Sequence, residues 1–309
     1  MIETIQHGQL KWQHITNPSE DDYKYLLDEY QFHPLDIEDC RGTNQRPKID
    51  EYDDYYFLIL HFPYFDKGNK FVRIREVKIF WGKDYIITIG KSHWVVKKLF
   101  DEMQEDLAEN DEDTLKALSC SDLLLYTILD RLMLETYTLI LRVGAEVDLI
   151  NYDIFNKKAQ SIIEIISIAR RNIISLNTTF KPQLRVLHMF ESGGIKGFVD
   201  PDQVDMEDYW GDILDQYQKM FDLVEDYGEL IEGLSKTFDS LQANKTNEIM
   251  KVLTYFSTIM LPLTVITGIF GMNVAFPFIS NTTAFWGIIG AMILLMGALI
   301  IFFQRRTGR

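Results

Sequence analysis

The pattern of apolar and polar positions divides the chain into two parts. Charged residues are spread along the chain up to Lys251, and none lies between Val252 and Gln304. Two apolar runs in this uncharged stretch, Val252–Phe270 and Ala284–Phe303, reach the length of about 20 residues that crosses a bilayer. We therefore predict two transmembrane helices. The alternative is a buried helical hairpin in a large soluble core.

Basic residues flank the two runs and predict their orientation. They are Lys245 and Lys251 before the first run, and Arg305, Arg306 and Arg309 after the second. The intervening segment, residues 274–283, has no Lys or Arg. By the positive-inside rule both ends of the chain lie in the cytoplasm, and the protein is placed in the cell inner (plasma) membrane. The polar N-terminal residues predict no signal peptide.

The first part of the chain has the pattern of a mixed α/β domain. LKWQHIT, YYFLILHFPYF and FVRIREVKIFWGKDYIITIG favour strands, and the break at Gly82-Lys83-Asp84 predicts a hairpin. NPSEDDYKYLLDEYQF favours a helix. After Ser92 the pattern is helical, with helices expected over HWVVKKLFDEMQEDL, over residues 114–155 and over residues 156–191. The segment ESGGIKGFVDP is a break.

The last helical segment is the longest. Between Val204 and Phe270 the only strong helix terminator is Pro262, so one helix on the order of 100 Å is expected to run through a stalk into the first span. Its apolar stripe predicts self-association. Two spans per chain make a poor conduit, so transport implies a cyclic homo-oligomer. The expected segments are 1–200 (cytoplasmic α/β and helical domain), 201–251 (stalk), 252–273 (first span), 274–283 (outer loop), 284–303 (second span) and 304–309 (basic tail).

Composition narrows the functional classes. The formal net charge of −15 argues against nucleic-acid binding, which needs a basic face. Two cysteines fit a reducing compartment and suggest neither a disulfide framework nor a zinc cluster. The chain lacks G-x-x-x-x-G-K-[ST], G-x-S-x-G and H-E-x-x-H motifs, so we expect no enzyme activity and no organic cofactor.

The first predicted span carries small and polar residues near one face. Asn247, Ser257, Thr264, Gly268 and Asn273 recur at spacings of three, four and seven, with some drift. Such residues let helices pack closely in lipid, which is the simpler interpretation. The functional interpretation is a pore lined by weak oxygen donors.

Two segments resemble the CorA family of magnesium transporters. Asn244–Asn273 resembles the end of the stalk and the first span, and it closes on the signature tetrad Phe270-Gly271-Met272-Asn273, where the family most often begins with Tyr. Phe32–Ile59 is similar to the family's H-P-L-x-x-E-D segment followed by Q-R-P-K. The resemblance covers both ends of the chain.

The resemblance implies a homopentameric funnel in which five first spans line a pore and five second spans form an outer ring. Asn273 would form an amide ring at the outer mouth, after a turn at Gly271 and Met272. Thr264 corresponds to a polar ring inside the pore. The positions that match apolar constrictions and their cytoplasmic flank are Leu253, Leu261, Met250 and Asn247. The alternative for Asn273 is a helix C-cap.

The resemblance also implies an intracellular Mg²⁺ sensor between subunits. The matching carboxylates are Asp39 and Asp212, with Glu38 and Asp130 as second contributors. A bound divalent ion would bridge like charges and hold the stalk closed. The alternative for each residue is a solvated acid.

The expected function is a divalent cation channel, mainly for Mg²⁺ uptake but also open to Co²⁺ and Ni²⁺, driven by the membrane potential. Its partners are copies of itself, divalent ions and the lipid bilayer. Many relatives have acids in the outer loop, whereas VAFPFISNTT has none. A ZntB-like Zn²⁺ transporter, with or without proton coupling, is therefore an alternative. A membrane-anchored sensor or scaffold without transport is another.

Overall fold

The computed structural model describes residues 2–43, 45–90, 93–155, 159–199, 204–272 and 282–307. The chain divides into two compact units, Met1–Ser235 and Lys236–Arg309. The boundary between them falls inside helix α7 (Met206–Phe270), which contributes to both units.

A six-stranded sheet organises the first unit. Its strands are β1 (Ile2–His7), β2 (Leu10–Thr16), β3 (Lys48–Glu51), β4 (Tyr55–Asp66), β5 (Phe71–Gly82) and β6 (Tyr85–Gly90). The strand order is β1-β2-β6-β5-β4-β3. Among the strand pairs of the described residues, β2–β6 is parallel and the others are antiparallel. The predicted hairpin is confirmed, because β5 pairs with β6 in antiparallel fashion, with Trp81 opposite Ile86.

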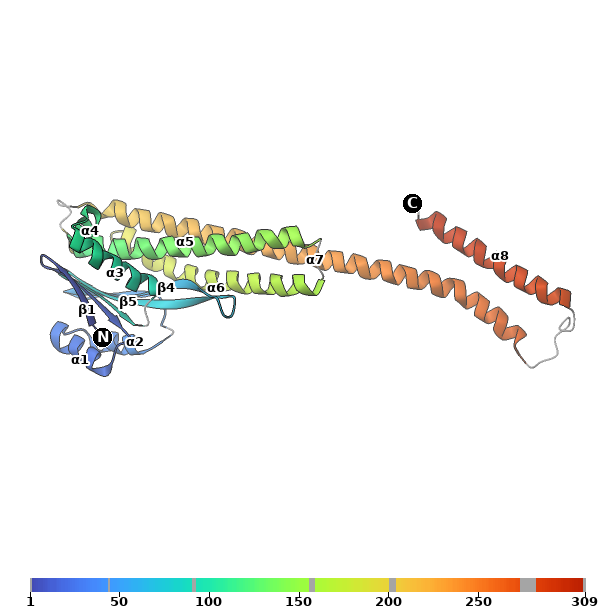
Figure 1. Ribbon diagram of the computed structural model, residues 1–309, viewed down its shortest axis with the longest axis horizontal. Helices are drawn as coiled ribbons and strands as arrows, with labels where there is room; N and C mark the ends of the chain where they lie inside the picture. The colour runs from blue at the N-terminus through green and yellow to red at the C-terminus, as the bar shows by residue number, and fades with distance from the viewer. Residues whose placement is uncertain are drawn as a thin grey trace. The chain divides into compact units, whose positions relative to one another are not determined.

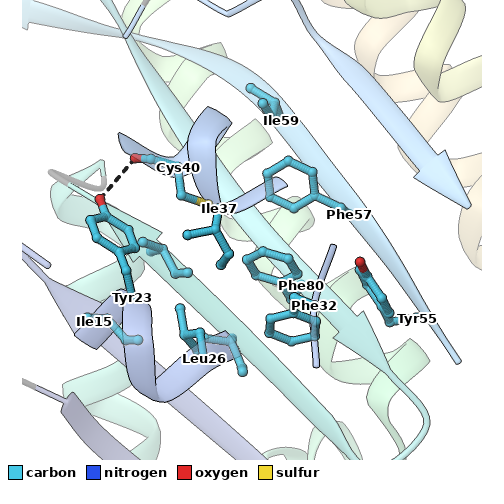
Figure 2. Close-up of a cluster of buried hydrophobic side chains, with 12 residues drawn as sticks. Ile15, Tyr23, Leu26, Phe32, Ile37, Cys40, Tyr55, Phe57, Ile59 and Phe80 are labelled. Carbon is cyan, nitrogen blue, oxygen red and sulfur yellow. Dashed lines mark hydrogen bonds between the residues drawn. The ribbon is translucent and has the colours of Figure 1, made fainter. Parts of the chain in front are cut away.

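One face of the sheet is covered by two short helices, α1 (Glu20–Tyr30) and α2 (Pro34–Arg41), which lie below the sheet in Figure 1. Helix α1 begins at Ser19, which forms a capping box with Asp22. Figure 2 shows the aromatic core beneath these helices, where Phe32 stacks on Phe80 with ring centroids 3.9 Å apart. The hydroxyl of Tyr23 donates to the carbonyl of Cys40 at 3.1 Å. This bond joins α1 to the end of α2.

The opposite face of the sheet carries the remaining helices of the first unit. They are α3 (Trp94–Glu109), α4 (Glu112–Ala117), α5 (Ser121–Asp153), α6 (Ala159–Glu191) and the first part of α7. Side chains alternate between the faces of a strand, so Phe80 points to α1 and α2, whereas Trp81 packs on Trp210 of α7. The sheet therefore separates two helical layers, as Figure 1 shows.

The prediction of one helix over residues 114–155 is wrong. The segment splits into α4 and α5, and Cys120 between them is extended, with φ −151°. Because of this break, side chains in the first turn of α5 accept hydrogen bonds in the core. Ser121 accepts a hydrogen bond from the Trp81 indole at 3.2 Å, and buried Asp122 accepts the amide of Phe198 at 3.0 Å. Side-chain acceptors of this kind favour helix starts over helix interiors.

The stalk stripe has a different partner from the one expected. Most of its apolar residues before Ser235 are buried within the same chain, with Tyr217 stacked on Phe180 of α6 at 4.6 Å, whereas Leu230 is exposed. Tyr227 lies so near α5 that a Cβ on Gly144 would sit 2.2 Å from its ring. Because α5 and α6 cover this stripe, the stripe by itself does not require a second chain.

The second unit holds the two apolar helices. The continuous helix predicted through the first span is confirmed by α7, which contains Pro262 without a break. The second is α8 (Thr282–Thr307). By length and hydropathy the described residues contain two candidate spans, Met206–Phe270 and Phe285–Arg305, whose most apolar windows are almost entirely uncovered. Uncovered apolar helices of this length fit a lipid environment.

Candidate functional site

The predicted pore residues lie on the part of α7 within the second unit. Asn247, Met250, Leu253, Leu261 and Thr264 are all exposed in the single chain. They recur at intervals that return to nearly the same side of a helix. The face they form is therefore open to another occupant.

The other face of α7 is turned toward α8. Leu263 is buried, and the rings of Tyr255 and Phe303 lie 4.5 Å apart. Tyr255 is near the start of the first span and Phe303 near the end of the second, so the two spans run antiparallel. Because α8 covers the face that carries Tyr255 and Leu263, it leaves the face with Leu253 and Thr264 uncovered.

The hydroxyl proton of Thr264 is used in a hydrogen bond within α7. Its Oγ1 donates to the carbonyl of Met260 at 2.9 Å, in the pattern that threonine often adopts in helices. A hydroxyl has one proton and two lone pairs, so the oxygen of Thr264 remains available as an acceptor. This position therefore presents an oriented, uncharged acceptor of the kind that can receive hydrogen bonds from the water shell of a cation.

The signature tetrad is described only in part. The amide of Gly271 donates to the carbonyl of Thr267 at 2.8 Å, after which the helix ends, and Met272 is exposed. Asn273 and residues 274–281 of the loop predicted over 274–283 lie outside the described residues. The helix thus ends at the position where the resemblance places the pore mouth.

Two of the predicted regulatory carboxylates, Asp130 on α5 and Asp212 on α7, share a hydrogen-bond donor. The Nε2 atom of Gln216 donates to Oδ1 of Asp130 at 3.2 Å and to Oδ2 of Asp212 at 2.7 Å. The hydroxyl of Tyr126 donates to the same Oδ2 of Asp212 at 3.1 Å. Burial, followed by the negative charges of Asp130 and Asp212, raises the pKa of Tyr126 well above its usual range, so it stays a donor.

The other two predicted carboxylates are on α2. Glu38 is exposed, and Asp39 is partly buried. Oδ2 of Asp39 forms an ion pair with Nζ of Lys48 at 2.7 Å, and Lys48 also pairs with Asp50. The two members of the predicted sensor therefore differ in their surroundings, because Asp39 faces a cation and Asp212 accepts bonds from uncharged groups.

Asp39 and Asp212 lie on opposite sides of the sheet in one chain. Asp39 belongs to α2 on the face with Phe32, and Asp212 follows Trp210 on the face with Trp81. The described residues contain no group of three or more His, Cys, Asp or Glu side chains that could hold a metal ion. Carboxylate oxygens are suitable ligands for Mg²⁺.

Several contact residues were not expected from the sequence. In the sequence Lys48 is marked only as the last residue of Q-R-P-K, and no motif marks Tyr126 or Gln216. Gln216 follows Asp212 by four positions, the helical spacing at which side chains meet, and this was the available signal. The bond from Tyr126 joins residues 86 positions apart, which no local pattern reveals.

The fold and these residues define a class of protein, an α/β domain that continues through one long helix into a pair of apolar, membrane-spanning helices. Residues 7–305 match the CorA-like Mg²⁺ transporter family, and the chain belongs to that family. It is 26% identical over 299 residues to the cobalt/magnesium transport protein CorA of Thermotoga maritima, covering 96% of this chain and 82% of that protein. It is 27% identical to the putative metal ion transporter YfjQ of Bacillus subtilis, covering 99% of this chain and 92% of that protein.

Solved structures share the fold. The complete CorA magnesium transporter from Methanocaldococcus jannaschii superposes with a TM-score of 0.80 at 20% identity, covering 97% of this chain and 92% of that chain. The ZntB cytoplasmic domain from Vibrio parahaemolyticus gives a TM-score of 0.59 at 14% identity, covering 76% of this chain and 88% of that chain. The predicted family is confirmed, and so is the predicted fold of the single chain, an α/β domain with one long helix and two apolar helices. The homopentameric funnel stays a prediction. The chain is a membrane transporter of the CorA type for divalent cations.

Proposed function

We propose that this protein is a homopentameric channel that admits Mg²⁺, and also Co²⁺ and Ni²⁺, from outside the cell. Both termini lie in the cytoplasm, and the membrane potential drives the flux. Two charges that enter at −100 mV gain about 4.6 kcal/mol, twice the value for one charge. The observation that carries the proposal is the uncovered face of α7, which presents Thr264 and apolar side chains opposite the surface packed toward α8.

Selection acts on a hydrated ion. Mg²⁺ loses its water reluctantly, and a pore that removed the water would need anionic ligands. The stretch from Val252 to Gln304 has no charged residue, so the lining groups are neutral. Rings of Thr264 hydroxyls and Asn273 amides can accept hydrogen bonds from the water shell, with the Asn273 ring at the outer mouth, beyond Gly271 and Met272.

Gating uses two apolar constrictions. Leu253 and Leu261 protrude from the uncovered face of α7, and five copies of each around an axis would form rings that exclude water when narrow. Asn247 and Met250 flank the inner constriction toward the cytoplasm. Widening the ring by a small rotation of α7 would let the hydrated ion pass.

Intracellular Mg²⁺ sets the gate through carboxylates of neighbouring subunits. Asp39 of one subunit and Asp212 of the next would share an ion, with Glu38 and Asp130 nearby. The separation of Asp39 from Asp212 by the sheet within one chain supports a site shared between chains. Without the ion, like charges face each other and push the subunits apart, which favours the open state.

Flux from liposomes tests the proposal. The purified protein should carry Mg²⁺ down a potential, and Asn273→Ala should abolish that flux while leaving the oligomer intact by size-exclusion chromatography. The same assay should be run with Co²⁺, Ni²⁺ and Zn²⁺, with and without a pH gradient. Mg²⁺ flux unchanged by Asn273→Ala would refute the entrance role, and no flux of any ion would favour a scaffold.

A zinc carrier is the second candidate function, because the cytoplasmic fold is also similar to the ZntB domain. That likeness concerns the fold alone. Zn²⁺ flux that follows an imposed pH gradient, with little Mg²⁺ flux, would establish this alternative. The first span, Val252–Phe270, contains no ionisable side chain apart from Tyr255. The proton carrier would then lie outside this span.

A further inference from the structure

Lys48 forms an ion pair with Asp39, the carboxylate that we assign to the regulatory site. It is the first residue of β3, and its ammonium lies 2.7 Å from Oδ2 of Asp39. It also pairs with Asp50 and lies 5.4 Å from the centroid of the Phe57 ring. The ammonium is thus held by two carboxylates and an aromatic face, and its side chain is only 33% exposed.

A second lysine, Lys78, holds the main chain at Asp39. The Nζ atom of Lys78 donates to the carbonyls of Asp39 at 2.8 Å and Gly42 at 2.7 Å. Lys78 is itself buried and pairs with Glu76 at 3.1 Å. A buried cation at the C-terminal carbonyls of α2 complements the negative end of the helix. The main chain of Asp39 is therefore held in place while its carboxylate pairs with Lys48.

Among the residues that the structure describes, no cation pairs with the partner carboxylate, Asp212. Both hydrogen bonds recorded for the Asp212 side chain come from the uncharged donors Tyr126 and Gln216, and both go to Oδ2. These bonds orient Asp212 without cancelling its charge. The charge of Asp39, in contrast, is neutralised by a unit positive charge at contact distance.

We propose that Lys48 is an internal competitor for the regulatory divalent cation and that it sets the concentration at which the cation binds. A Mg²⁺ ion approaching Asp39 meets repulsion from the Lys48 ammonium and must displace it. Lys48 keeps Asp50 as a partner after displacement, so the exchange is reversible and its cost is limited. The chain thereby stays insensitive to traces of Mg²⁺ and responds only when the ion is abundant.

This inference rests on the proposed sensor role of Asp39, and protease protection of the full-length protein in detergent tests it. Lys48→Gln removes the charge, and the Mg²⁺ concentration for half-maximal protection should fall about three- to ten-fold, in line with the energy of one partly exposed ion pair. Lys48→Arg keeps the charge and should stay within about two-fold of wild type. Lys48→Met repeats the charge removal if the glutamine variant does not elute as the native oligomer.

Lys97 provides a matched control. It also pairs with two carboxylates, Glu3 and Asp101, and its side chain is 36% exposed, close to the value for Lys48. Lys97→Gln should leave the Mg²⁺ concentration for half-protection unchanged. An unchanged or higher value for both charge-removing variants of Lys48, or an equal shift for Lys97→Gln, would overturn the role of Lys48.

An Asp39→Ala/Asp212→Ala double variant separates the two proposals. If its Mg²⁺ protection equals that of wild type, the sensor assignment is wrong and the role of Lys48 falls with it. If the double variant loses protection but Lys48→Gln has no effect, only the role of Lys48 is wrong. Adding Lys48→Gln to Asp39→Ala should produce no further shift, because the competition requires the Asp39 carboxylate.

Discussion

The hydroxyl of Tyr126 on α5 donates a hydrogen bond to Oδ2 of Asp212 on α7 at 3.1 Å. Gln216 donates to the same oxygen, so no hydrogen bond is recorded to Oδ1 among the described residues. The two bonds hold Oδ2 of Asp212 toward Tyr126 and Gln216. Partners of this kind orient a metal ligand without touching the metal.

Tyr126→Phe should therefore weaken regulation by Mg²⁺. The carboxylate loses one of its two orienting donors, and the Mg²⁺ concentration for half-maximal protease protection should rise about three- to ten-fold. Tyr209→Phe is the control, because Tyr209 packs against the ring of Tyr126 at 4.8 Å without a recorded bond to Asp212. Equal responses of the two variants would show that packing, rather than the hydrogen bond, supports the site.

Gly197→Ala should destabilise the cytoplasmic domain. Gly197 has φ +67°, and a Cβ there would lie 2.1 Å from Oδ1 of Asp122, which is 1% exposed. We expect a loss of about 1–3 kcal/mol in the free energy of unfolding from strain and contact together. Thermal unfolding of the purified protein measures this loss.

Gly193→Ala is the matched control for that contact. Gly193 has φ +68°, but a Cβ there would meet nothing within 4 Å. Gly193→Ala should introduce the backbone strain alone and lower the free energy of unfolding by about 1 kcal/mol. A loss for Gly197→Ala no larger than that for Gly193→Ala would contradict the importance of the Asp122 contact.

The sequence predicted the elements whose patterns are long or strongly marked. The strand LKWQHIT coincides with β2, and the continuous helix through Pro262 coincides with α7. β1 and β3 were missed. In β1 only Ile5 is buried, and β3 has four residues, none fully buried, so neither edge strand shows a regular alternation.

The candidate site was predicted less completely for a physical reason. Motif resemblance located Asp39 and Asp212, but their surroundings depend on contacts between distant parts of the chain. The Asp39–Lys48 pair connects α2 to β3, and the Tyr126–Asp212 bond connects two helices. The sequence hides the break at Cys120 because its neighbours on both sides have helical patterns. The extended conformation of Cys120 starts α5 where Asp122 can accept a hydrogen bond from the amide of Phe198.

Acid should destabilise the cytoplasmic domain through buried His14. Burial lowers the pKa of His14 to about 4, against opposing effects of nearby Glu3 and Asp101. The unfolded chain takes up a proton as the pH falls below about 6.5, and the folded chain only near pH 4. The unfolded state thus binds more protons in this window, so stability falls by about 3 kcal/mol between pH 6.5 and pH 4.

His14→Gln should make this pH dependence shallower, whatever its effect on stability at neutral pH. Unfolding midpoints measured from pH 7 to pH 4 provide the slope. His188→Gln, at a histidine whose side chain is about half exposed, measures how much a histidine-to-glutamine change outside the core alters the slope. A slope for His14→Gln identical to that of wild type would assign the acid sensitivity to other groups, among them His61 and His93, whose pKa values burial also lowers.

Leu253→Ser should open a leak through the closed pore. A ring of five serines holds water where five leucines exclude it, so the barrier from dewetting disappears. Flux of Mg²⁺ from liposomes at an inhibiting internal Mg²⁺ concentration should rise on the order of ten-fold. Val252→Ser is the matched control, because Val252 is 60% exposed and Leu253 58%, but successive positions are turned by about 100° around the helix. The control should show no leak, since Val252 would face away from the pore axis. A leak of equal size in both variants would indicate damage to the span and would contradict a constriction at Leu253.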